Sequence, residues 1–145
     1  TLAVTNFKTY GQTDAVYTEV DEQAMYNNGD ISGVAAFFME NIVYPKSAID
    51  NNVSGKIFVQ FVIDEWGNVT DEKLVWREFK DGSGKQIAIE GEKPVSATEI
   101  NSQAVSELEN EVLRVVRLLK GFTPAKKDGK NVKSQYTIPV KFSFE

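Results

Sequence analysis

The feature that most constrains the fold is the C-terminal segment from Gln135 to Phe144. Every second residue in it is large and apolar: Tyr136, Ile138, Val140, Phe142 and Phe144. Such alternation is typical of a β-strand that buries one face. The segment also contains Pro139, which has no backbone N–H to donate, and proline in a sheet is found almost only at an edge or a bulge. The sequence therefore predicts a sheet whose last strand, at 134–144, lies at an edge.

Two further strands are predicted near the middle of the chain. Residues 55–64 place large apolar side chains on one face, namely Ile57, Val59, Phe61 and Ile63. Turn residues follow at 64–68, and the segment from Val69 to Phe79 is again rich in β-branched and aromatic residues. This pattern predicts a β-hairpin with strands at 55–64 and 68–79. Upstream, Ala15-Val16-Tyr17 predicts one short strand.

Helical spacing of apolar residues is clearest from Ile100 to Leu119, and Gly121 follows as a left-handed cap. An earlier segment, with Asp30 or Ser32 as its N-cap, has the same spacing as far as Ile42. A short helix is predicted at 46–50, because Pro45 suits the first position of a helix and disfavours helical geometry at the residue before it. A loop is predicted at 123–133.

These elements predict a single α+β domain, in which helices pack on one face of a three-stranded antiparallel sheet. A length of 145 residues fits one domain. We expect residues 1–43 to form an N-terminal extension on a domain of residues 44–145. Residues 80–98 are rich in glycine and are interpreted as an inserted loop with room for a short strand of its own. No apolar run approaches the ~20 residues of a membrane helix, so the chain as given is expected to be soluble.

The composition disfavours catalysis, because cysteine and histidine are both absent. Without them the chain lacks thiolate metal sites, the usual zinc ligand and the common nucleophile and base pairs. Asp64, Glu65 and Asp71 near the hairpin turn could form a carboxylate pair or a calcium site, but their spacing matches no calcium loop. We interpret them as solvated turn residues. The expectation is no catalytic residue, no metal, no cofactor and no enzymatic activity.

Charge is unevenly distributed along the chain. Residues 114–141 hold eight Lys or Arg against the single acid Asp128, a net charge of +7 in a chain whose total is −5. This segment is either a solvated surface or a basic rim that steers an acidic partner. The overall acidity disfavours a nucleic-acid partner. Trp66, in the hairpin turn, is either a contact residue or tucked over its own hairpin.

Two blocks of short motifs occur in a specific order. The first comprises Tyr44-Pro45, Ala48, the strand at 55–64 and Gly67-Asn68-Val69-Thr70-Asp71. The second comprises Leu113-Arg114-Val115-Val116, Phe122-Thr123-Pro124-Ala125, Asp128-Gly129-Lys130-Asn131-Val132 and the segment from Tyr136 to Phe142. Together they resemble the TonB C-terminal domain family, in the versions common in Bacteroidetes-type envelopes. The residues that carry the motif are Tyr44, Pro45, Gly55, Gly67, Phe122, Pro124 and Gly129. Phe122 departs from the family, which usually has tryptophan there, as does Lys120-Gly121, where a proline is common.

The resemblance implies a periplasmic domain that grips a short extended segment of an outer-membrane TonB-dependent transporter. It further implies an inner-membrane anchor, outside the chain as given, that connects the domain to an energising complex and so powers nutrient uptake. In that family the partner adds as a strand to the last strand of the sheet. The implied contact residues are Gln135, Tyr136, Thr137, Ile138, Pro139, Val140 and Lys141, together with Phe58.

Three other interpretations of the edge stay open at this point. Pro139 and Lys141 could protect it from any partner. A second copy of the chain could pair with it and form a homodimer. The module could also serve as an interaction or sensory domain of another envelope protein, without a role in transport.

Overall fold

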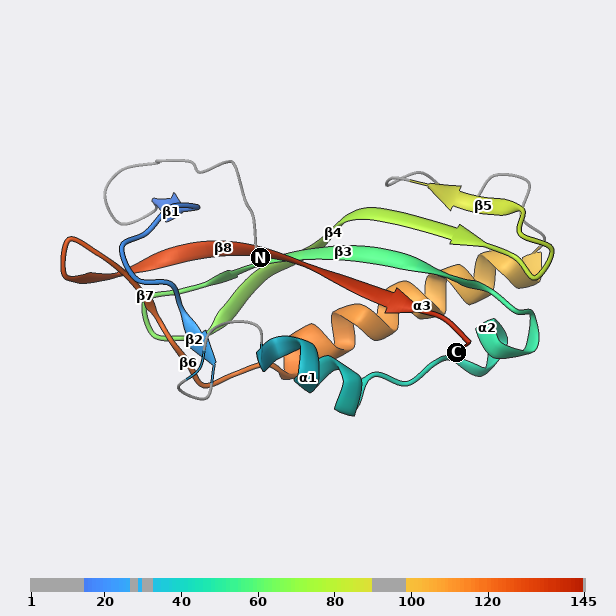
Figure 1. Cartoon of the computed structure of the whole chain (residues 1–145), viewed down its shortest axis with the longest axis horizontal. Helices are drawn as coiled ribbons and strands as arrows, with labels where there is room; N and C mark the ends of the chain where they lie inside the picture. The colour runs from blue at the N-terminus through green and yellow to red at the C-terminus, as the bar shows by residue number, and fades with distance from the viewer. Residues whose placement is uncertain (1–14, 27–28, 30–32, 90–98, 145) are drawn as a thin grey trace. The chain divides into compact units, whose positions relative to one another are not determined.

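Figure 1 shows the computed structural model, which describes residues 15–26, 29, 33–89 and 99–144. The described helices are α1 (Gly33–Asn41), α2 (Lys46–Asp50) and α3 (Glu99–Leu118). The described strands are β1 (Val16–Tyr17), β2 (Met25–Tyr26), β3 (Ser54–Ile63), β4 (Val69–Lys80), β5 (Gln86–Ile89), β6 (Phe122–Thr123), β7 (Ala125–Lys127) and β8 (Lys130–Phe142). The proposed helix caps Asp30 and Ser32 lie outside the described residues.

The predicted α+β class is confirmed, and the three main strands are neighbours in one sheet. Its strand order is β1-β8-β3-β4-β5, with β7 also paired to β8, and a separate two-stranded sheet joins β2 to β6. β5 is the short strand expected within the insertion, and it runs antiparallel to β4. β1 runs parallel to β8, with Val16 opposite Lys133 and Tyr17 opposite Ser134. The sheet is therefore mixed rather than purely antiparallel.

The loop predicted at 123–133 is wrong, because most of that segment is β-structure. β7 and the start of β8 form a tight hairpin in which Lys127 lies opposite Lys130. The two turn residues, Asp128 and Gly129, have φ angles of 54° and 78°. An Asp-Gly pair with both φ angles positive is the favoured two-residue connection of a hairpin. The Asp128-Gly129 pair in the sequence therefore indicates a hairpin, with one strand on each side of the turn.

The chain divides into two compact units. The first comprises Thr1–Asn41, Gln60–Glu72 and Val116–Ile138, and the second comprises Ile42–Val59, Lys73–Val115 and Pro139–Glu145. The expected division into an extension at 1–43 and a domain at 44–145 stays a prediction.

In the first unit, the core includes Phe61, Phe122 and Tyr136. The ring of Tyr136 lies 6.4 Å from that of Phe61, between centroids. Its hydroxyl accepts a hydrogen bond from the backbone N–H of Ala24 at 2.9 Å. A buried phenol requires such a partner, because an unpaired polar group away from water destabilises the fold. Tyr136 therefore ties the N-terminal segment to β8.

In the second unit, α3 packs on the sheet through Ala104, Val105, Leu108, Val112 and Val115, all buried. Their three-and-four spacing is the pattern that predicted this helix. Arg77 of β4 pairs with Glu109 of α3, and both side chains are mostly buried. Gly55 of β3 lies so close to β4 that an added Cβ would be 2.1 Å from the carbonyl oxygen of Glu78. Only glycine, whose side chain is a hydrogen atom, fits at this position.

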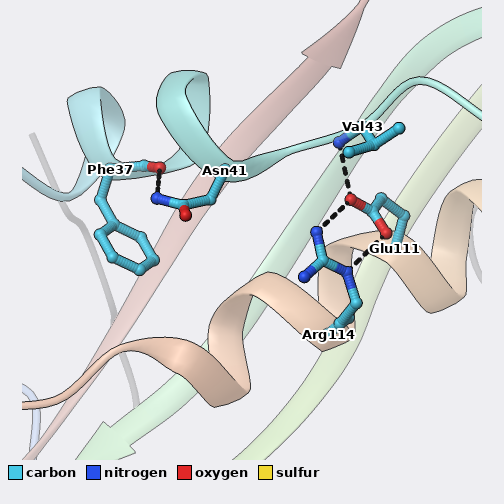
Figure 2. Close-up of polar contacts among 5 residues, drawn as sticks. All are labelled: Phe37, Asn41, Val43, Glu111 and Arg114. Atoms are coloured by element: carbon cyan, nitrogen blue, oxygen red, sulfur yellow. Dashed lines mark hydrogen bonds and ion pairs between the residues drawn. The ribbon is translucent and has the colours of Figure 1, made fainter.

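The second unit also holds a charged link between α3 and the segment before α2. Figure 2 shows the carboxylate of Glu111, which accepts a hydrogen bond from the backbone N–H of Val43 at 2.6 Å. The Arg114 guanidinium donates to the same carboxylate at 2.8 and 2.7 Å. This hydrogen bonding by Arg114 lowers the pKa of Glu111 below its ordinary value of 4.5. In the first unit, Figure 2 shows the Asn41 amide bonded at 2.8 Å to the Phe37 carbonyl oxygen at the end of α1.

Replacing Gly55 with alanine should destabilise the fold by about 1–3 kcal/mol, because its Cβ would force β3 away from β4. The free energy of unfolding from chemical denaturation measures this effect. Gly33→Ala is the matched control, since its Cβ would meet nothing closer than the Tyr26 side chain at 3.5 Å. Both changes remove the same backbone freedom from the unfolded chain. Equal stabilities for the two variants would contradict the close approach.

The link at Glu111 predicts a specific pH dependence of stability. A carboxyl whose pKa is lower in the folded state stabilises the fold above its unfolded pKa, here near 4.5, and loses this effect as the pH falls through the folded pKa. Glu111→Gln should therefore lower the free energy of unfolding near pH 7 by about 0.5–1 kcal/mol, and the difference from wild type should shrink below pH 4.5. A pH-independent difference would contradict the role of the charge.

Candidate functional site

The candidate site is the strand edge of β8. β3 is its neighbour in the sheet, whereas β1 pairs only with Lys133 and Ser134 and β7 only with 130–132. Within the described part of the chain, no second strand pairs with β8 from Gln135 to Phe142. On this side, no described strand pairs with the backbone donors and acceptors of that length. The prediction that the last strand lies at an edge holds only in part, because β1 lies outside the start of β8, and partner binding along β8 stays a prediction.

The side chains of β8 alternate between the core and the surface. The buried set is Tyr136, Ile138, Val140 and Phe142. Gln135 and Thr137 are partly exposed, and Pro139 and Lys141 are exposed. Of the predicted contact residues, Tyr136, Ile138 and Val140 can thus offer a partner only their backbone. Phe58, also predicted, is partly exposed on β3 and lies beneath the Lys56 ammonium, 5.8 Å from its ring centroid.

Tyr44 holds the end of β8 in place within the second unit. Its ring stacks on Phe144 at 4.9 Å and meets Phe142 edge-on at 5.3 Å, between centroids. Its hydroxyl donates to the carbonyl oxygen of Val53 at 2.5 Å. Burial raises the pKa of Tyr44 to about 12, so the hydroxyl stays a donor at neutral pH. The motif Tyr44-Pro45 therefore has a positioning role that the sequence did not reveal.

The other motif residues also have structural positions. The carbonyl of Pro45 accepts the first hydrogen bonds of α2, from the backbone N–H groups of Ala48 and Ile49. Gly67 has a φ angle of 85°, and a Cβ there would be 2.1 Å from the carbonyl oxygen of Phe122.

Phe122 is buried in β6, where its ring lies 5.0 Å from that of Tyr26. Pro124 connects β6 to β7, and Gly129 completes the hairpin turn described above. None of these motif residues belongs to the exposed face of β8. Their contacts shape the backbone around β8.

Asp64 of the β3–β4 turn is buried, so its interpretation as a solvated turn residue is wrong. Oδ1 of Asp64 accepts hydrogen bonds from the backbone N–H groups of Trp66 and Asn68, at 2.9 and 2.8 Å. Across the described ranges, no group of three or more acidic residues is placed to hold a metal ion. Trp66 is 77% exposed, so the interpretation that it is tucked over its own hairpin is wrong.

Part of the basic segment is neutralised by acidic partners. Arg114 pairs with Glu111, as described above, and Arg117 pairs with Glu72 at 2.7 Å. Hydrogen bonding by Arg117 lowers the pKa of Glu72. Lys127 lies over the ring of Tyr17, 5.7 Å from its centroid. The free positive charge of this segment is therefore smaller than its net count suggests.

A surface groove of about 750 Å³ adjoins the end of the β8 edge, within the second unit. It lies among the start of β3, the end of β4, part of β5 and the end of β8. Lys56, Lys80 and Lys141 line it, with Glu78 as its acidic residue and Phe144 as an apolar wall. Sequence reasoning missed this groove, because its lysines are far apart in the chain and belong to no shared motif.

Comparisons with known proteins give one weak likeness. No family model matches the chain, and no curated protein matches it either. The chain is similar to the NMR solution structure of the TonB-CTD of Helicobacter pylori, residues 179–285, with 23% identity, 77% of each chain covered and a TM-score of 0.40. A TM-score at this level does not support an assignment of function. Among the described helices, none combines the length and apolar character needed to cross a membrane.

The hydrogen bond of the Tyr44 hydroxyl predicts that removing this hydroxyl destabilises the fold. Tyr44→Phe should lower the free energy of unfolding by about 1 kcal/mol, because the Val53 carbonyl loses its donor. It should also speed hydrogen exchange of the amides near Phe142. Tyr26→Phe is the control, since the Tyr26 hydroxyl has no hydrogen bond to a described residue. If both variants behave like wild type in denaturation and exchange, Tyr44 does not anchor β8.

Proposed function

We propose that this chain is a binding module of the TonB C-terminal type, which docks a short extended segment of an outer-membrane transporter on the edge of β8. The observation that carries the proposal is the stretch from Gln135 to Phe142, where no described strand pairs with the second side of β8. The two blocks of motif residues in the sequence support the proposal independently. The module acts by binding and transmitting force and performs no chemical step.

The physics of the edge favours an extended peptide as the ligand. Natural proteins normally cover, twist or charge an exposed edge, because it can pair with other chains. β8 is long, and on its surface face it carries only one charged residue between Gln135 and Phe142, namely Lys141. A partner strand would satisfy the open backbone groups, and its alternate side chains would meet Gln135, Thr137 and Lys141. Affinity then comes from the backbone and selectivity from these side chains.

The proposed setting is the periplasm. In this setting the module is held at the inner membrane by a segment outside the chain as given, and it connects an energising complex to the transporter. The sequence resemblance supports this setting. A protein that connects an inner-membrane complex to an outer-membrane transporter must reach both membranes. A second copy of the chain competes for the same edge, so a homodimer would be an inhibited form.

One observation favours a second candidate function. The insertion adds β5 to the opposite side of the sheet, where Phe79 pairs with Ala88 and Glu78 with Ile89. This added strand covers part of the β4 edge and gives the module a surface that the motif residues do not account for. A module reused as an interaction or sensory domain of another envelope protein would have reason to carry it. Deletion of 82–90 should then abolish binding of that partner, and transporter peptides should not bind β8 with or without the deletion.

An NMR titration tests the leading proposal directly. The ligands are short N-terminal plug peptides from outer-membrane transporters of the same cell. We expect amide shifts that cluster on residues 134–144 and follow one saturation curve, because a paired strand changes every backbone environment along the edge. Shifts confined to any other surface, or no shifts with the whole peptide set, would reject docking on β8.

Disulfide trapping then measures the register. The chain contains no cysteine, so a single introduced thiol is unique. Thr137→Cys should cross-link to peptides that carry cysteine at successive positions, with yields that alternate every second residue, because facing side chains alternate between strands. Lys73→Cys on the exposed side of β4 is the control and should give low, non-alternating yields. Similar yields at both sites would indicate non-specific contact.

A further inference from the structure

The groove beside the end of β8 has features of a binding site for negative charge. Three of its lining residues are lysines, at positions 56, 80 and 141, and Glu78 is the acidic residue among them. None of these lysines forms an ion pair with a described acidic residue. Lys80 and Lys141 are exposed, and Lys56 rests on the ring of Phe58. The groove therefore concentrates positive charge in a chain that is acidic overall.

The groove is continuous with the proposed docking edge. Lys141 and Phe142 belong to β8 and also line the groove, together with Ser143 and Phe144 just after the strand. A segment paired with β8 as far as its end would pass Lys141, which also lines the groove. Its volume of about 750 Å³ exceeds what a single side chain occupies. Several residues that flank a docked strand would therefore fit.

We propose that this groove binds a short acidic flank of the partner peptide, so that carboxylates meet Lys56, Lys80 and Lys141 while the rest of the peptide pairs with β8. This inference rests on the proposed strand addition and adds to it the chemistry of the ligand. It also gives the docked strand a direction. If the partner runs antiparallel to β8, the acids precede its paired residues, and if it runs parallel, they follow them.

Four synthetic peptides test this inference. They share one alternating Thr-Val strand, which carries either three Glu or three Gln residues at either its N-terminal or its C-terminal end. We expect one of the two Glu peptides to bind about tenfold more tightly than its Gln counterpart, since three partly exposed charge pairs contribute modestly each. Its binding should shift the amides of residues 56, 80 and 141, and the gain should fall as salt is added.

Two triple variants provide the matched comparison. Lys56→Gln, Lys80→Gln and Lys141→Gln together should bring the affinity of the Glu peptide down to that of its Gln counterpart, and the readout is the ratio of these two affinities within one variant. Lys73→Gln, Lys120→Gln and Lys130→Gln change the net charge equally, lie outside the groove lining and should preserve the gain. Thermal melting of both variants verifies that they fold.

The outcomes separate this inference from the proposed function. Shifts along 135–141 with no preference for Glu over Gln, or a preference that both triple variants lose equally, overturn the acidic groove and leave strand addition standing. A Glu-dependent response in the groove without shifts along 135–141 overturns strand addition, and with it the inference that the groove serves a docked strand. No shift in either region overturns both.

Discussion

The structure depends on β8, which buries one face in the core and has one side along which no described strand pairs beyond Ser134. Its even-numbered side chains enter the core, where Tyr136 also satisfies the backbone N–H of Ala24, while no described strand covers its second side from Gln135 onward. An open edge in water is not costly, because solvent satisfies its donors and acceptors. The buried face provides the stability and fixes the register, since a slip of one residue would turn Tyr136 and Ile138 outward. A rigid strand with an accessible backbone is the result, and such a strand loses little entropy on binding.

Outside β8, the residues that make the sequence recognisable mainly support the backbone. Gly55 and Gly67 stand where another backbone comes too close for a Cβ, and Tyr44 locks the end of β8 through Val53, Phe142 and Phe144. They preserve the shape of the sheet and the position of its last strand. A motif of this kind indicates a scaffold, whereas the side chains that select a ligand are free to differ. This separation explains why a resemblance can indicate strand addition without identifying the peptide.

Local patterns in the sequence were sufficient for most of the elements but not for their long-range pairing. The period-two runs at β3 and β8 and the long apolar stripe of α3 were each visible within a short window. The hairpin at Asp128-Gly129 is also local, because an Asp-Gly pair favours a two-residue turn. The parallel pairing of Val16 with Lys133 could not be predicted from the local sequence, because a strand of two residues has no pattern that sets its register. Lys56, Lys80 and Lys141 likewise meet only after β3, β4 and β8 have been placed side by side.

Strand addition alone is a weakly selective way to bind, because every extended peptide offers the same backbone groups. Selectivity requires side chains beside the edge, and the surface face of β8 offers only Gln135, Thr137 and Lys141 around a proline. Pro139 lacks a backbone donor, so any strand that pairs there, the proposed partner and a second copy of β8 alike, forms one hydrogen bond fewer. A basic groove at one end would add both a chemical preference and a direction, at the point where the Tyr44 ring packs on Phe142 and Phe144. The open edge would then provide general affinity, and the lysines would decide which segment stays bound.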